Sequence, residues 1–203
     1  MIKPAKLFLI RHAPVKQITG FFPKHNPNAI IKDSQFKKLA TLIPNNCVWY
    51  VSPLKRAIQT AKALSKYVTY SKMINENKLV EQNFGDWSGK KISEIWEILK
   101  KNKNRHNFSF ISPGVSPPNG ESFKELSKRV EIWVKHLDLS EGKSIVIISH
   151  AGTIRSILSY ALKIKPDYAI GIEILNQSLN ILEMIANNDN KYKGGRFRLI
   201  ALN

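Results

Sequence analysis

Arginine and histidine side chains follow short apolar runs at two places in this sequence of 203 residues. Arg11 and His12 come directly after residues 7–10, and His150 follows residues 145–148. A neutral imidazole nitrogen can attack phosphorus and form a covalent phosphohistidine. A guanidinium group holds phosphoryl oxygens through parallel hydrogen bonds and stabilises their charge in the transition state. The combination therefore indicates phosphoryl-transfer chemistry.

A second arginine and a carboxylate could complete such a site. Arg56 lies in residues 52–61, directly after another apolar run, and Glu81 lies in residues 79–87. A carboxylic acid is needed to protonate the departing alkoxide of a phosphate ester, and Glu81 is our candidate for that acid. Each residue also has a structural alternative, because Arg56 could be a surface cation, His150 a buried core histidine and Glu81 a solvated carboxylate.

Apolar periodicity predicts the elements that would position these side chains. Short apolar runs bounded by turn residues predict about six strands, over residues 6–10, 48–51, 144–148, 169–175, 178–186 and 196–202. Apolar residues at helical spacing predict helices over residues 54–64, 92–99, 123–137 and 154–162.

Strands that alternate with helices predict an α/β fold. We expect a three-layer α/β/α arrangement with a mostly parallel central sheet of about six strands and helices on both faces. Polar turn residues at 187–195 predict that the sheet ends in an antiparallel pair. We expect a single domain over residues 1–203, with insertion or lid segments at about 21–33 and 100–119. In such sheets ligands bind at the carboxyl ends of the strands, where the arginine–histidine pairs fall.

The charge balance is strongly basic, with 32 Lys and Arg against 15 Asp and Glu and a formal net charge of +17. Such an excess is typical of proteins with polyanionic partners, acidic membrane surfaces or phosphorylated substrates. A coding bias would also produce it, since 25 lysines accompany only 7 arginines. The lysines are dispersed and have no aromatic residues between them, which disfavours a nucleic-acid partner.

The single cysteine, Cys47, excludes an internal disulfide framework and a multi-cysteine zinc site. A chain with one thiol is compatible with a reducing cytoplasm. The sequence has no apolar stretch near the roughly 18 residues of a membrane span. We therefore expect a cytoplasmic protein without a membrane partner.

Five segments, in order, resemble the motifs of the histidine phosphatase superfamily, also called phosphoglycerate-mutase-like. These motifs are Arg-His-Gly after the first strand, Ser-Pro-x-x-Arg-Ala-x-x-Thr-Ala, Glu-x-x-Phe-Gly-x-Trp-x-Gly, Ser-His-x-Gly and a Pro-Gly-Gly-Glu-Ser segment. The corresponding residues here are 9–12, 52–61, 81–89, 149–152 and 117–122. The resemblance spans roughly residues 6 to 200 and implies a phosphoglycerate-mutase-like fold.

The resemblance also implies roles for individual residues. His12 would be the nucleophile that becomes phosphorylated. Glu81 would donate a proton to the leaving group and later activate water. The phosphoryl group would be held by four further groups: Arg11, Arg56, His150 and the backbone N–H of Gly152. Members of this family require no metal or other cofactor.

The chain departs from the family pattern in its first motif. Ala13 replaces the glycine, which can serve close packing or a left-handed backbone. Ile18 stands where the family usually has a phosphate-pocket asparagine, and Thr19, Lys16 and Lys24 are candidates to replace that group. Substrate recognition is the property that these changes affect most.

The resemblance favours a metal-independent phosphomonoesterase that acts on a small phosphorylated metabolite. The Arg-His-Ala-Pro-Val opening and residues 117–122 look most like the α-ribazole-phosphatase-like branch, so α-ribazole-5'-phosphate is a candidate substrate. A phosphoglycerate mutase is an alternative, although Phe84 stands where mutases carry tyrosine. An inactive basic polyanion-binding protein is a further alternative. Dimerisation is common in the superfamily, which leaves a homodimer open.

Overall fold

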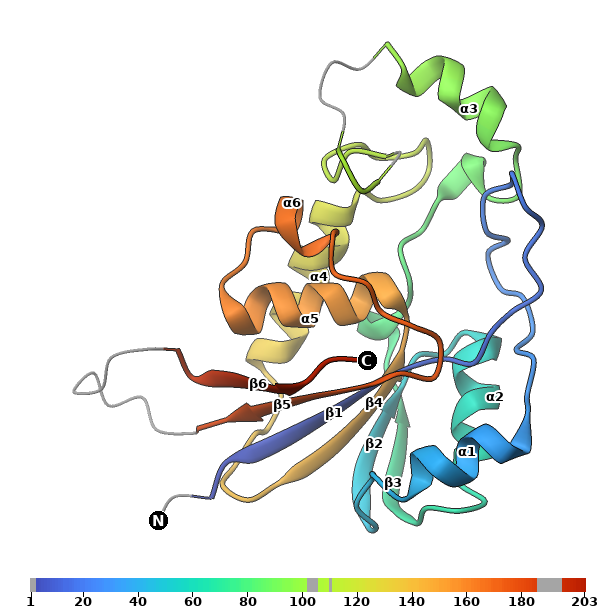
Figure 1. The fold of residues 1–203 in the computed structure, drawn as a ribbon. Coiled ribbons are helices and arrows are strands. Elements are labelled where there is room, and N and C mark those ends of the chain that lie inside the picture. The colour runs from blue at the N-terminus through green and yellow to red at the C-terminus, as the bar shows by residue number, and fades with distance from the viewer. Residues whose placement is uncertain (1–2, 102–105, 110, 186–194) are drawn as a thin grey trace.

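A computed structural model describes residues 3–101, 106–109, 111–185 and 195–203. A six-stranded sheet with the order β3-β2-β4-β1-β5-β6 forms its centre (Figure 1). The strands are β1 Ala5–Arg11, β2 Cys47–Val51, β3 Tyr70–Asn75, β4 Ser144–Ser149, β5 Leu179–Met184 and β6 Phe197–Ala201. Strands β1 to β4 run parallel to one another, whereas β5 runs antiparallel to both β1 and β6. The predicted mostly parallel sheet and the antiparallel final pair are therefore confirmed.

Helices cover both faces of this sheet, as the three-layer prediction requires (Figure 1). The helices are α1 Asp33–Ala40, α2 Lys55–Leu64, α3 Ile92–Leu99, α4 Phe123–Lys135, α5 Ala151–Leu162 and α6 Pro166–Ala169. Helices α1 and α2 cover one face, and α4 and α5 cover the other. Two 3₁₀ turns, Asn77–Leu79 and Gly85–Trp87, flank the segment that carries Glu81.

The central strands are buried on both faces, and this fixes their position. Along β1, Leu7 and Leu9 pack into the core beneath α4 and α5, whereas Phe8 and Ile10 pack beneath α1 and α2. Successive strand side chains point to opposite faces, so a continuous apolar run is what a doubly covered strand needs. The carboxyl ends of β1 and β4 are consequently held in a fixed relation to each other.

Two features of the sheet differ from the sequence prediction. The expected strand over residues 169–175 is wrong, because Pro166 begins α6 and the chain then turns. Proline fits the first position of a helix, since the N–H that it lacks is unpaired there anyway. Strand β3 was not predicted because this edge strand is largely exposed and polar, with Lys72 at its centre. The expected turn over residues 187–194 lies outside the described residues.

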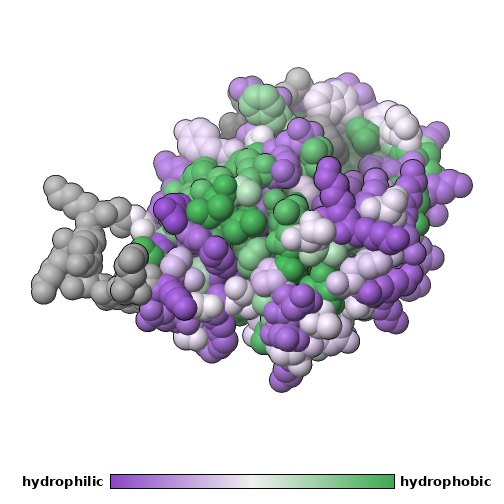
Figure 2. Space-filling model, turned by 60° about the horizontal axis from the view of Figure 1, so that its bottom comes forward, coloured by the Kyte–Doolittle hydropathy of each residue, from purple (hydrophilic) through white to green (hydrophobic). Residues whose placement is uncertain are grey.

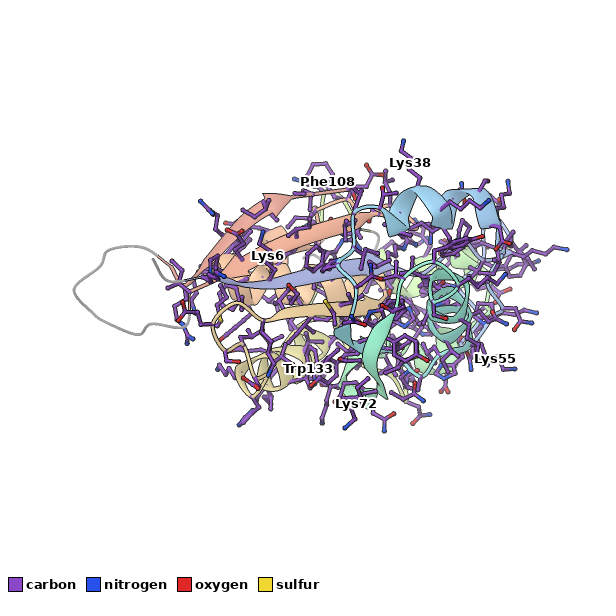
Figure 3. All side chains as sticks on the ribbon, turned by 90° about the horizontal axis from the view of Figure 1, so that it is seen from below. Lys6, Lys38, Lys55, Lys72, Phe108 and Trp133 are labelled. Carbon is purple, nitrogen blue, oxygen red and sulfur yellow. The ribbon has the colours of Figure 1, made fainter. Side chains whose placement is uncertain are left out.

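Basic side chains are spread over the surface. Lys6, Lys38, Lys55 and Lys72 lie on four different elements and project to different sides (Figure 3). On the face shown in Figure 2, hydrophilic residues lie mostly toward the rim, and apolar residues gather between them. Among the helices that the structure describes, none has both the length and the apolar character needed to cross a membrane.

The packing of α4 leads to a stability prediction. Leu126 of α4 is fully buried, whereas Ile132 on the same helix is 48% exposed. Leu126→Ala should lower the free energy of unfolding by about 2–5 kcal/mol, because it removes buried methyl groups and leaves a cavity. Ile132→Ala is the matched control and should change it by less than about 0.5 kcal/mol. Urea unfolding measures both, and equal losses would contradict this placement of α4.

Candidate active site

The carboxyl ends of three neighbouring strands bring the predicted residues together. Beyond β1 and β2 the parallel ladder continues, with the His12 N–H donating to Ser149 O (2.9 Å) and the Ser52 N–H donating to Ile148 O (3.0 Å). His150 follows directly after β4 and precedes α5. The imidazole rings of His12 and His150 lie 5.0 Å apart between their centroids. The sheet edge thus assembles the two histidines from residues far apart in the sequence.

The His12 ring is fixed in one tautomer. Its Nδ1 lies 2.7 Å from Ala13 O, and the Arg56 Nε–H donates to its Nε2 over 3.1 Å. Because a carbonyl oxygen only accepts, Nδ1 carries the proton and Nε2 carries the lone pair. Burial, with a smaller effect of the Arg56 and Arg11 charges, lowers the pKa of His12 from 6.5 to about 3. At neutral pH the ring is therefore uncharged and presents a nitrogen lone pair.

Residues near the carboxy terminus hold the backbone at this position. The Asn176 Nδ2–H donates to His12 O (3.0 Å), and the Gln177 N–H donates to Arg11 O (3.0 Å). Ala13, the substitution in the first motif, is fully buried in the core beneath α1 and α2, and its φ is not positive. The backbone here does not need a glycine, and the alanine methyl group fits.

His150 and Arg11 present unpaired buried polar atoms. The His150 Nε2 lies 2.7 Å from Ser52 Oγ, while its Nδ1 has no partner among the described residues. Arg11 donates from Nη1 to Ile174 O (2.6 Å), but its Nε is likewise buried and without a described partner. Burial first, then nearby charges led by Arg56, lowers the pKa of His150 well below 6.5. Buried donors without acceptors are costly, so a ligand that brings acceptor oxygens would suit this site.

The segment expected as an insertion at 21–33 lies against the start of α2. Arg56, which is 7% exposed, donates from Nη1 to His25 O (3.2 Å). The Asn26 Oδ1 accepts from the Lys55 N–H (2.8 Å) at the first turn of α2. The segment therefore orients the Arg56 side chain, and the guanidinium group is buried as a result.

Glu81 lies over the amino-terminal end of α5. Its Oε2 accepts from the Gly152 N–H (3.2 Å), and its Oε1 accepts from the Gln82 N–H (3.0 Å). A Cβ atom at position 152 would collide with the Glu81 carboxylate, so the close approach requires glycine. The resemblance implied that the Gly152 N–H contacts phosphate. In this structure it instead holds the proposed acid.

An ion pair fixes the backbone on both sides of Glu81. The Glu121 Oε1 accepts from Arg129 Nη2 (2.6 Å) and from the Asn83 N–H (3.2 Å). The same Arg129 Nη2 donates to Val80 O (3.2 Å). The Glu121–Arg129 pair thus ties residues before and after Glu81 to helix α4.

The candidate residues line a cavity of about 180 Å³. Sequence reasoning placed Arg11, His12, Arg56 and Glu81 here, and the structure brings all four to its wall. Thr19, a predicted phosphate ligand, is exposed and is not among the lining residues. Several lining residues were not selected from the sequence: Val15, Gln17, His25, Leu54, Gln82 and Ser88. Only the position of Gln17, beside the missing asparagine, could have suggested a role.

The electrostatics of this cavity favour an anion. Burial lowers the pKa of both Arg11 and Arg56, and the Glu81 carboxylate acts in the opposite direction on each. Two guanidinium groups therefore face a single carboxylate beside two neutral imidazoles. Within the part of the chain that the structure describes, no group of three or more His, Cys, Asp or Glu side chains could hold a metal ion.

Curated proteins with similar sequences have several different names. An adenosylcobalamin/alpha-ribazole phosphatase of Salmonella typhimurium is 26% identical over 166 residues, which covers 77% of this chain and 79% of that protein. A bifunctional protein of Mycobacterium tuberculosis is 28% identical over 136 residues, or 66% of this chain but only 36% of that protein. This chain thus spans about a third of the length of that longer relative.

Solved structures share the fold over nearly the whole chain. An alpha-ribazole phosphatase from Shigella flexneri superposes with a TM-score of 0.73 at 21% identity, covering 98% of this chain and 96% of that one. A mycobacterial glucosyl-3-phosphoglycerate phosphatase gives a TM-score of 0.74 at 19% identity and covers 99% of both chains.

A comparison with the sequence patterns of protein families shows to which family the chain belongs. The sequence pattern of the histidine phosphatase superfamily (branch 1) matches residues 33–193, which is most of the chain. The fold, with its strand ends converging on two histidines, agrees with this match. This chain belongs to the histidine phosphatase superfamily, branch 1.

Proposed function

We propose that this protein is a metal-independent phosphomonoesterase that hydrolyses a small phosphorylated metabolite through a phosphohistidine at His12. The observation that carries the proposal is the fixed His12 tautomer, with Nδ1 bound to Ala13 O and the lone pair of Nε2 directed toward Arg56. A neutral ring held in this way is ready to act as a nucleophile. The Arg56 guanidinium group, now bonded to the ring, would turn to the phosphoryl oxygens when substrate binds.

In the first step, the lone pair of His12 Nε2 forms a bond to phosphorus while the bond from phosphorus to the ester oxygen breaks. Glu81, in its acid form, gives its proton to that oxygen, so the product leaves as a neutral alcohol. Arg11 and Arg56 stabilise the charge on the phosphoryl oxygens. With the Ser52 hydroxyl donating to Nε2 of His150, the unpaired Nδ1 carries a proton and donates to the same group.

In the second step, water attacks the phosphorus of the phosphohistidine, and the bond to His12 Nε2 breaks. The Glu81 carboxylate, now ionised, accepts a proton from that water. Inorganic phosphate forms, and both residues return to their starting states. The Gly152 N–H and the Glu121–Arg129 pair keep Glu81 in place for both proton transfers.

The substrate within this class is the finer part of the proposal. Relatives named alpha-ribazole phosphatase, from Salmonella typhimurium and Shigella flexneri, make α-ribazole-5'-phosphate a candidate. The mycobacterial neighbour named glucosyl-3-phosphoglycerate phosphatase adds an ester whose alcohol carries a carboxylate. A substrate panel should therefore contain esters of both kinds, together with 3-phosphoglycerate.

The low pKa of His12 gives a pH prediction. Between pH 3 and 6.5 the unfolded chain binds a proton at this residue and the folded chain does not, so the free energy of unfolding falls as pH falls through this range. From pH 7.5 to 5 the loss from this ring should be about 1–2 kcal/mol. Urea unfolding of His12→Gln should show a weaker pH dependence than the wild type. Identical pH dependence would contradict a neutral, buried ring.

The central experiment is phosphate release from p-nitrophenyl phosphate in EDTA. We expect turnover by the wild type and none by His12→Ala, because the variant lacks the nucleophile. Acid-labile phosphate on the quenched wild-type protein, absent from His12→Ala, would identify the intermediate. Turnover by the variant, or loss of wild-type activity in EDTA, would contradict the proposal.

The role of Glu81 gives a leaving-group prediction. Glu81→Gln cannot donate the proton, so it should slow alkyl phosphate hydrolysis by about 10²-fold or more. Hydrolysis of p-nitrophenyl phosphate, whose leaving group needs little protonation, should slow much less. Glu94→Gln makes the same exchange at an exposed position of α3 and is the control. Equal losses for the two esters in Glu81→Gln would argue against the acid role.

A further inference from the structure

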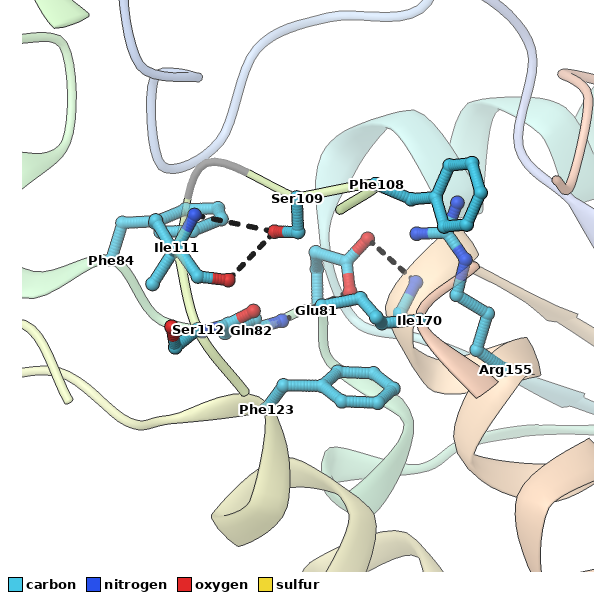
Figure 4. Close-up of a pocket in the computed structure, with 11 residues that line it drawn as sticks. Glu81, Gln82, Phe84, Phe108, Ser109, Ile111, Ser112, Phe123, Arg155 and Ile170 are labelled. Carbon is cyan, nitrogen blue, oxygen red and sulfur yellow. Dashed lines mark hydrogen bonds between the residues drawn. The ribbon is translucent and has the colours of Figure 1, made fainter. Parts of the chain in front are cut away.

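A second cavity, of about 170 Å³, also has Glu81 in its wall (Figure 4). It shares Glu81, Gln82 and Phe84 with the cavity that contains His12. An engineered protein cavity of about 150 Å³ is large enough to hold benzene, so this one has room for a ring or a short chain. Glu81 therefore lies in the lining of two adjoining cavities, one that contains the nucleophile and one that does not.

Apolar and polar side chains share the lining of the second cavity, with Gln82, Ser109 and Ser112 among the polar ones. The side chains of Phe84, Phe108, Ile111, Phe123 and Ile170 line it. Contacts across the fold hold the wall around Phe108 in place, since this ring lies against Gly171 and the His106 Nε2 lies 2.6 Å from Asp167 O. This wall belongs to the segment predicted as a lid at 100–119.

One cation, Arg155, lies in the lining of this cavity. It lies on α5, one turn beyond His150, and its Nε–H donates to Ile172 O (2.6 Å). Among the described residues, no acceptor bonds its two terminal nitrogens and no carboxylate lies within ion-pair distance. The charges of Glu81 and of the exposed Glu173 interact with the Arg155 charge only over longer distances. These terminal nitrogens are therefore available to donate to an anionic group that enters the cavity.

The charge balance during catalysis strengthens this point. Arg11, Arg56 and Arg155 all interact electrostatically with Glu81. In the proposed first step Glu81 is a neutral acid, and the phosphoryl group brings two negative charges. Arg11 and Arg56 compensate these two charges in the first cavity. The positive charge of Arg155 is then left without a counterpart in the second cavity.

We propose that the second cavity binds the alcohol part of the substrate, and that Arg155 selects alcohols that carry a carboxylate on an apolar or aromatic body. This inference rests on the proposed function. The alcohol oxygen must reach Glu81 to receive its proton, and Glu81 is part of the wall of the second cavity. A third cavity, of about 450 Å³, adjoins the first one through Val15, Gln17 and Pro23, but Glu81 is not part of its lining.

The test compares 4-carboxyphenyl phosphate with its neutral amide, 4-carbamoylphenyl phosphate. We expect the wild type to prefer the carboxylate by about tenfold or more in kcat/KM. Arg155→Met should bring the ratio close to one, mainly through kcat/KM of the charged ester. Each variant is judged by its own ratio of kcat/KM for the charged ester to kcat/KM for the neutral ester. A general loss of phosphoryl transfer lowers both values equally and leaves this ratio unchanged. Arg155→Lys keeps the charge and should retain part of the preference.

Lys24→Met is the matched control, since Lys24 lines the first cavity and the exchange removes one positive charge. It should keep the wild-type ratio. A preference that disappears in Lys24→Met but persists in Arg155→Met would place the alcohol elsewhere and overturn the inference. A wild-type ratio near one would overturn this inference and leave the proposed function standing. If the wild type hydrolyses neither ester nor p-nitrophenyl phosphate, the proposed function fails and the inference fails with it.

Discussion

The His12 ring is held between a carbonyl acceptor and a guanidinium donor, and the rest of the site depends on this arrangement. Ala13 O fixes the proton on Nδ1, and the Arg56 Nε–H marks the position of the Nε2 lone pair. Burial keeps the ring neutral, because an imidazolium would be poorly solvated beside two arginines. Reactivity at neutral pH thus follows from the same packing that makes protonation of the ring costly.

The fold supplies this packing through the two-sided burial of its central strands. Side chains of β1 alternate between the two helical layers, so neither the register nor the tilt of the strand can change without exposing apolar surface. The residues directly after the strand ends are therefore held in place as well. Contacts from Asn176 and Gln177 then fix the last part of the backbone, from a segment more than 160 residues along the chain from His12.

The sequence predicts best where one local rule applies. Strands β1 and β4 were predicted because buried parallel strands are continuous apolar runs, and their ends located Arg11, His12 and His150. The prediction failed for residues 169–175, where Pro166 and the following turn override the apolar composition. Arg129 carries no local signal, since its importance comes from contacts with residues distant in the sequence.

Glu81 contributes to the walls of two cavities, and this affects the order in which the products leave. Under the proposed chemistry, the alcohol departs from one space while phosphorus stays attached to His12 in the other. The space vacated at Glu81 is then open to whichever hydroxyl compound enters next. Water would complete hydrolysis, whereas a second alcohol retained there would receive the phosphoryl group. Under the proposed chemistry, hydrolysis and phosphoryl transfer to a second alcohol would therefore compete for occupancy of one small cavity.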